Sequence, residues 1–173
     1  MAFSILRTIR ALAAPDHHIS CSQSVWQQGI LELRHRGYGC RESGAFLLGL
    51  IDSGRRRIIK FLYYDDLDPH CLDKGFVDFD GRYFGKLWDV CRKTGLSVVA
   101  DVHTHPEIAK QSRIDRRNPM IGQAGHVAIL VPNYAQQEPR LAKLGVYEYL
   151  GDHQWADYYG SAAFRYFYIG ILG

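Results

Sequence analysis

The stretch Leu96–Pro106 reads LSVVADVHTHP, a nearly continuous apolar run that ends in two histidines and a proline. A run of this kind between Gly95 and Pro106 predicts a strand over 96–105 that is buried inside a sheet. Side chains alternate along a strand, so His103 and His105 point to the same face, with α-carbons about 6.6 Å apart. One metal ion can contact both imidazoles, and their place at the strand end is accessible to solvent and substrate.

The stretch that follows supplies a third candidate ligand. Asp115 lies ten residues after His105 and three after Ser112. If Ser112 opens a helical turn, those two side chains share one face of it, and Asp115 completes a set of two imidazoles and one carboxylate. A catalytic zinc ion requires three protein ligands and one open position, whereas a structural zinc ion takes four. Two histidines at this spacing also occur as packed core residues, so the pair alone leaves that alternative open.

The segments before this strand predict a helix followed by a hairpin. The helix is capped by Ser20 or Ser22, carries apolar residues at intervals of three and four, and ends at Gly37 and Gly39. Three strands are expected around it, over 3–12, 43–51 and 57–64, the last two joined by the turn sequence Asp52-Ser53-Gly54.

The rest of the chain predicts a second helix and more strands. Residues 65–80 carry six aspartates and one lysine and are expected to form a surface loop. A helix over 82–94 ends at Gly95. Further strands are expected over 126–131, 145–149 and 164–169, around an aromatic-rich loop that contains Trp155, Tyr158 and Tyr159.

Length and composition exclude several classes of protein. The 173 residues, 47% of them hydrophobic, indicate one domain over 1–173 and are too few for a closed α/β barrel of roughly 250 residues. A net charge of +3 gives little reason to expect a nucleic-acid partner. No apolar run approaches the roughly 20 residues of a membrane span, and no secretion signal opens the chain, so we expect a cytoplasmic protein without a membrane partner. The four cysteines form no CxxC pair and are expected as free thiols.

Three pieces of the sequence together resemble the JAMM (JAB1/MPN/Mov34) metalloprotease family. The family motif is E…H-[ST]-H-P…S-x-x-D, and here Glu42 stands in the stretch RESGAFLLG, His103 and His105 in HTHP, and Ser112 and Asp115 in SRID. The resemblance spans roughly residues 6–149, with the element order strand, helix, Glu-bearing strand, second strand, helix and His-x-His strand. Six residues separate His105 from Ser112, where the common eukaryotic pattern has seven, and prokaryotic members match more closely.

The resemblance implies an α/β fold of the cytidine-deaminase-like JAMM/MPN type, with a mixed, largely antiparallel curved sheet flanked by helices. It implies one catalytic Zn²⁺ bound by His103, His105 and Asp115. Glu42 is then the residue that holds and deprotonates the water bound to zinc and returns the proton to the leaving amine. Ser112 is the donor to the oxyanion.

The resemblance also implies a function and partners. We expect a deubiquitinase-like isopeptidase that cleaves after the C-terminal glycine of a ubiquitin-like protein, for deconjugation or precursor maturation. Bacterial relatives occur with E1-like and E2-like enzymes in antiphage or related operons, which makes these enzymes possible partners. Two alternatives remain open: a JAMM hydrolase acting on a sulfur-carrier conjugate or a small amide, and a non-catalytic MPN scaffold.

Some residues around the motif carry weaker hypotheses. Asp101 lies on the same face of the predicted strand as His103 and is a candidate hydrogen-bond acceptor for its imidazole. The more common alternative is an aspartate that is solvated or hydrogen-bonded to another group. His126 begins the next strand and is expected to pack. The acidic segment 65–80 is a candidate for attracting a basic tail, with a solvated loop as the alternative. The basic sets 55–57 and Arg113, Arg116 and Arg117 are candidates for an acidic partner surface.

Overall fold

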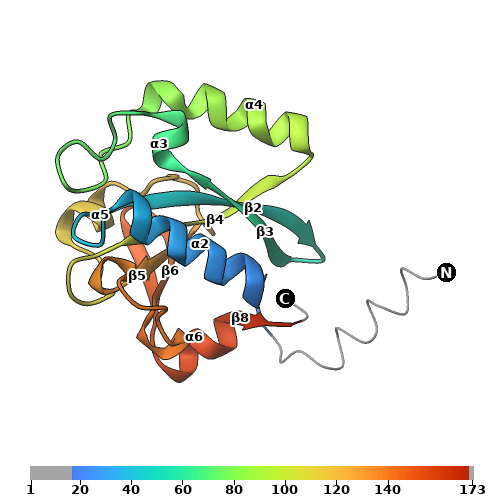
Figure 1. Ribbon diagram of the computed structural model, residues 1–173. Helices are drawn as coiled ribbons and strands as arrows, with labels where there is room; N and C mark the ends of the chain where they lie inside the picture. Colours follow the sequence, from blue (N-terminus) through green and yellow to red (C-terminus); the bar gives the residue numbers. More distant parts are fainter. Residues whose placement is uncertain (1–16, 172–173) are drawn as a thin grey trace.

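The computed structural model of the protein describes residues 17–171, which form one curled sheet with helices on both faces (Figure 1). The strand expected over 3–12 lies outside the described residues. The eight strands are β1 (Ile19–Ser22), β2 (Gly44–Asp52), β3 (Arg55–Tyr63), β4 (Ser97–Thr104), β5 (Val127–Val131), β6 (Gly145–Gly151), β7 (Gln154–Tyr158) and β8 (Phe167–Gly170). They are ordered β7-β6-β5-β4-β2-β3-β1-β8, and four of the seven pairings are antiparallel. The expected mixed sheet with helices beside it is therefore confirmed.

The helices of the described residues include the two that the sequence predicts. They are α2 (Gln23–Arg36), α3 (Tyr64–Leu67), α4 (Phe84–Thr94), α5 (Arg113–Arg117) and α6 (Ser161–Tyr166), with short helical turns η1 (Gly81–Tyr83), η2 (Asn133–Ala135) and η3 (Leu141–Lys143). Ser22 caps α2 by accepting a hydrogen bond from the Val25 N–H at 3.3 Å. Gly95 ends α4 in the left-handed conformation (φ +68°), which glycine adopts without a steric penalty. No described helix is long and apolar enough to cross a membrane.

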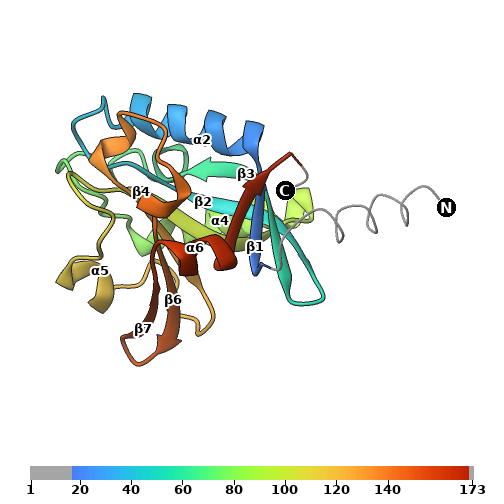
Figure 2. The same ribbon diagram turned by 90° about the horizontal axis from the view of Figure 1, so that it is seen from below.

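The sheet separates two apolar layers. On one face, α2 and α6 pack over a core that includes Trp26, Leu33 and Phe167. On the other face, α4 covers a second core built around Phe46, Tyr64 and Leu87. Figures 1 and 2 show α2 and α4 on opposite sides of β2 and β3. Strand β4 lies fourth in the sheet order, so its C-terminal end reaches an interior position between β2 and β5.

Four expectations need correction. The helix expected from Arg82 begins as the turn η1, and its α-helical part starts at Phe84. The aromatic loop after residue 149 contains strand β7, and the strand expected over 164–169 is helical as far as Tyr166 before β8 begins. The segment 65–80 is not wholly a surface loop, because it starts in helix α3 and buries Cys71 together with Asp68. Asp68 accepts backbone hydrogen bonds from His70 and Asp80 and so organises the turns that follow.

Candidate metal centre

The His-x-His pair lies at the end of β4, as its position before Pro106 predicts. His103 belongs to the strand and His105 follows its last residue, so the strand is one residue shorter at each end than expected. Both side chains are buried, and their Nε2 atoms lie 3.1 Å apart. The backbone of His105 is still held, because its N–H donates to the Val131 carbonyl and its own carbonyl accepts from the Tyr134 N–H, each at 2.8 Å.

The Tyr134 contact depends on an unusual turn after β5. Asn133, Tyr134 and Ala135 all have positive φ, between 51° and 55°, although none is glycine. This conformation costs roughly 1–2 kcal/mol at Tyr134 and at Ala135, whereas asparagine tolerates it. Conformations of this cost are retained where the surrounding structure requires them, often at functional sites. This turn brings a backbone donor to His105, and Pro132 with Asn133 marks it in the sequence.

Helix α5 positions the third candidate ligand. Ser112 is its N-cap, as expected, and its Oγ accepts hydrogen bonds from the N–H groups of Ile114 and Asp115 at 3.2 and 3.1 Å. The Asp115 carboxylate in turn accepts from the Ser112 N–H at 2.6 Å. This capping box fixes the side chain of Asp115 before any metal binds.

The three ligand atoms converge. His103 Nε2 lies 3.7 Å from Asp115 Oδ1, and His105 Nε2 lies 3.3 Å from Asp115 Oδ2. Ligands about 2.0–2.2 Å from a tetrahedral Zn²⁺ are separated by about 3.4 Å. The imidazole nitrogens are 3.1 Å apart, and each lies 3.3–3.7 Å from a different oxygen of Asp115, which is close to this value; the one-carboxylate, two-imidazole donor set also suits zinc. The residues present therefore fit the ion that the sequence implies.

The charges of the three ligands are coupled. Burial alone would raise the pKa of Asp115, but the hydrogen bond from His105, the charge of His103 and the bonds with Ser112 hold that pKa well below its usual range. Burial alone would lower the pKa of His103, but Asp101, Asp115 and Glu42 raise it above its usual 6.5. The carboxylate is thus kept ionised, which is the form that binds a metal.

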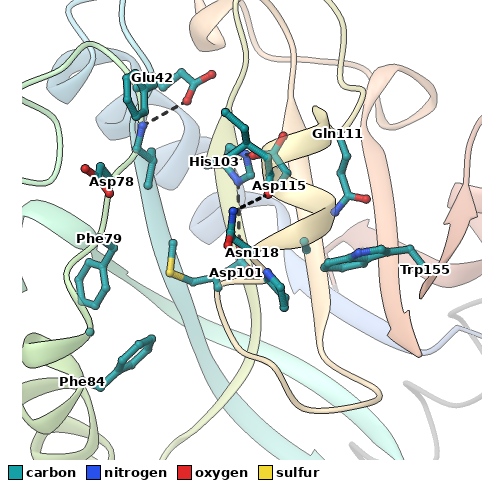
Figure 3. Close-up of a pocket in the computed structure, with 17 residues that line it drawn as sticks. Glu42, Asp78, Phe79, Phe84, Asp101, His103, Gln111, Asp115, Asn118 and Trp155 are labelled. Atoms are coloured by element: carbon teal, nitrogen blue, oxygen red, sulfur yellow. Dashed lines mark hydrogen bonds and ion pairs between the residues drawn. The ribbon is translucent and has the colours of Figure 1, made fainter. Parts of the chain in front are cut away.

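Glu42, His103 and Asp115 line one cavity of about 300 Å³. Glu42 lies two residues before β2 rather than in a strand, and its Oε2 accepts a hydrogen bond from the Val77 N–H at 3.2 Å. Figure 3 shows Glu42 and Asp78 across the cavity from His103 and Asp115. Beyond the polar groups, the walls are apolar and aromatic, with Phe76, Phe79, Phe84, Met120 and Trp155.

The structure shows the contacts of Asp101 and His126, the two weaker candidates near the sheet. Asp101 is buried, and its Oδ1 lies 2.6 Å from His126 Nε2. Its Oδ2 accepts a hydrogen bond from the Tyr64 hydroxyl at 3.1 Å and lies 3.9 Å from His103 Nδ1, a distance of an ion pair rather than a hydrogen bond. His126 is buried as expected, but it contacts a carboxylate instead of packing only against apolar groups.

Several aspartates of segment 65–80 form ion pairs with cations of the chain itself. Asp65 and Asp66 both form ion pairs with Arg36 at 2.7 Å, and Asp78 pairs with Lys74. These contacts favour a structural role for the segment over attraction of a basic tail. Among the basic sets, Arg116 binds Asp157 at 3.1 Å beside the cavity.

Comparison with known proteins gives information on the fold but not on the candidate site. No protein-family model matches the chain. The fold is similar to the solution structure of protein DSY2949 from Desulfitobacterium hafniense, with 15% identity and a TM-score of 0.62 over 82% of this chain and 90% of that one. It is also similar to the solution structure of a protein from Salinibacter ruber strain DSM 13855, with 18% identity and a TM-score of 0.52 over 80% and 87% of the two chains. At these identities the likeness concerns the fold alone.

Proposed function

We propose that this protein is a zinc-dependent isopeptidase of the JAMM/MPN family that cleaves after the C-terminal glycine of a ubiquitin-like protein. The observation that carries the proposal is the convergence of His103, His105 and Asp115, whose ligand atoms all lie within 4.8 Å of one another. Glu42 lies on the cavity that His103 and Asp115 line. The order of these residues along the chain is that of the family motif, and a curled mixed sheet between helices is compatible with the JAMM/MPN type of fold.

Each motif residue has a chemical role in this proposal. His103, His105 and Asp115 would hold the ion, and zinc bound there polarises a carbonyl oxygen and lowers the pKa of water toward about 7. Glu42 accepts the proton of the attacking water and later returns it to the leaving amine. Ser112 Oγ accepts two backbone hydrogen bonds, which leaves its own hydrogen to donate to the carbonyl oxygen as that oxygen gains charge.

The cavity supports a substrate with little side-chain bulk at the reacting bond. Phe79, Phe84 and Trp155 line the same cavity as His103 and Asp115 and give it bulky aromatic walls. Glycine residues, which lack a side chain, pass such walls more easily than other residues do. An extended tail that ends in glycine can also bind through its backbone, by addition to a sheet edge, with little demand on sequence.

A second candidate keeps the metal centre but takes a smaller substrate. The 300 Å³ cavity is at the lower end of the range for small-molecule sites and also suits a small amide or the conjugate of a sulfur-carrier protein. A scaffold without activity is less consistent with the chain, because all five motif residues are present. For the isopeptidase, E1-like and E2-like enzymes of a bacterial, antiphage-type conjugation system are the partners we propose.

Two substrates offered in parallel to the zinc-loaded protein separate these candidates. One is ubiquitin carrying a peptide extension after its last glycine, and the other is a short peptide ending in Gly-Gly coupled through an amide to a fluorophore. Mass spectrometry locates the cleaved bond. Cleavage of the fusion after its glycine supports the isopeptidase, and cleavage of the short amide alone supports the second candidate. If neither substrate is cut faster than by chelator-treated protein, the peptidase proposal is wrong.

A further inference from the structure

A buried carboxylate lies directly behind the candidate metal centre. Asp101 is 1% exposed and stands two residues before His103 on the same face of β4. Its two oxygens contact three side chains: Oδ1 lies 2.6 Å from His126 Nε2, and Oδ2 lies 3.1 Å from the Tyr64 hydroxyl and 3.9 Å from His103 Nδ1. An ionised carboxylate at this depth requires such partners, because an isolated buried charge is strongly destabilising.

The sheet register brings these groups together. Asp101 is paired with Ala128 of β5, and His126 precedes Ala128 by two residues, which places its side chain on the same face. On the other side, β2 presents Gly44 to β4. A Cβ on Gly44 would meet the Tyr64 ring at 2.2 Å, so only glycine leaves room for the ring that carries the hydroxyl to Asp101.

The hydrogen-bond pattern sets the proton positions. Asp101 is contacted by groups that can each donate a hydrogen, so its carboxylate is the acceptor, and the Tyr64 hydroxyl and the His126 Nε2–H both donate to it. His103 Nε2 faces the other two ligands. For that atom to bind a metal, the ring proton has to be on Nδ1, which faces Asp101.

We propose that Asp101 and His126 form a positioning pair that holds the His103 imidazole with Nε2 toward the metal. His126 fixes the carboxylate through Oδ1, and the charge of the carboxylate, with Oδ2 at 3.9 Å, attracts the N–H of the non-ligating nitrogen of His103 without a direct hydrogen bond. Neither residue belongs to the candidate ligand set. The inference rests on the proposed zinc site and adds two residues to it that the motif lacks. Partners of this kind typically change metal affinity by about 10–100-fold.

Zinc affinity of the full chain, measured by chelator competition, tests the pair. His126→Leu removes the donor to Asp101, and we expect zinc binding to weaken about 10–100-fold. His126→Gln is the matched control, because its amide N–H can still donate to Asp101, and we expect affinity within a few-fold of wild type. The Co²⁺ absorption spectrum gives a second readout, which should change in His126→Leu and be retained in His126→Gln. Thermal unfolding of each metal-free variant separates lost affinity from lost stability.

Tyr64→Phe provides the same test if His126→Leu fails to fold. It removes one hydroxyl from Asp101 and keeps the ring, and a several-fold loss of zinc affinity is expected. Wild-type affinity in folded His126→Leu, or a loss in His126→Gln as large as in His126→Leu, would overturn the positioning pair and leave the zinc site intact. A wild-type protein that binds no zinc would overturn the proposed function itself, and the inference with it.

Discussion

Ser112 and Asp115 hold each other in place: the Ser112 hydroxyl accepts from the Asp115 N–H at 3.1 Å, and the Asp115 carboxylate accepts from the Ser112 N–H at 2.6 Å. A proposed metal ligand and a proposed oxyanion donor are thus joined in one capping box at the start of α5. This arrangement gives Ser112 two separable contributions, one to the stability of the helix end and one to the reaction.

Replacing Ser112 by alanine should reveal both contributions. Loss of the cap is expected to lower the free energy of unfolding by about 1 kcal/mol, and loss of the oxyanion donor should lower kcat about 10²–10³-fold. Urea unfolding and steady-state kinetics measure the two effects, and Ser112→Thr, which keeps a hydroxyl, is the control. A Ser112→Ala variant with at least half of the wild-type kcat would exclude the oxyanion role.

The affinity for zinc should fall on acidification. In the metal-free protein, the pKa of His103 is raised above 6.5 by Asp101, Asp115 and Glu42, against the effect of burial. Protons therefore compete with zinc for His103 already above pH 6.5. Chelator competition between pH 5.5 and 8 measures the decrease, and an affinity that is constant over this range would contradict the charge coupling.

The stability of the metal-free protein should depend on pH through the same two groups. The raised pKa of His103 contributes stability that is fully present below about pH 6.5 and is lost as pH rises through its folded value. The lowered pKa of Asp115 contributes stability that is present above about pH 4 and is lost as pH falls. Their combined contribution is thus largest between about pH 4 and 6.5. The free energy of unfolding of metal-free wild type and of metal-free Asp115→Asn, measured as a function of pH, isolates the contribution of Asp115. The variant should lack the loss of stability that this carboxylate causes on acidification.

Removal of the metal should destabilise the protein. A ligand held at 1,000 times its Kd stabilises the folded state by about 4 kcal/mol, and each kcal/mol changes the Tm of a domain this size by about 2–4 °C. A strong chelator is therefore expected to lower Tm by roughly 8–16 °C, and added zinc should restore it. The control is His105→Ala, whose Tm should not respond to the chelator. An unchanged wild-type Tm would argue against a bound metal.

Gly44→Ala should disturb the support of the metal centre. Its Cβ would overlap the Tyr64 ring at 2.2 Å and approach the Val102 carbonyl oxygen at 2.9 Å. We expect a loss of about 1–3 kcal/mol in the free energy of unfolding. Gly85→Ala is the matched control, because nothing lies within 4 Å of its Cβ and alanine favours a helix interior by about 0.5–1 kcal/mol. Equal stabilities of the two variants would mean that Tyr64 does not require the glycine.

Sequence patterns predict the parts of this fold that are long or clearly capped. Helix α2 has Ser22 at its start, α4 has Gly95 at its end, and the β2–β3 hairpin turns at Ser53-Gly54. Strand β1 has only four residues, which is too few for an alternating pattern to show. The sequence predicts only a helix cap in this stretch. Helix α6 passes directly into β8 at Phe167, a change of period that no glycine or proline marks.

The candidate site also has one part that the sequence predicts and another that it does not. His103 and His105, with Ser112 and Asp115, are close in the chain, so strand alternation and a helical turn are enough to predict that each pair shares a face. The contact between His126 and Asp101 depends on the register of two parallel strands, and local spacing carries no information on register. In the left-handed turn at residues 133–135, Asn133 tolerates positive φ, but Tyr134 and Ala135 do not favour it, and the hydrogen bond from the Tyr134 N–H to His105 at the end of β4 depends on tertiary structure.

Cleavage of the ubiquitin fusion by the wild-type protein and by Glu42→Gln, both loaded with zinc, tests the central claim most directly. Glutamine can still accept the hydrogen bond from the Val77 N–H, so the fold and the zinc content should be unchanged, while the proton acceptor is lost. The account predicts cleavage after the terminal glycine by the wild type and a rate at least about 10²-fold lower in the variant. Equal rates in the two proteins would contradict it.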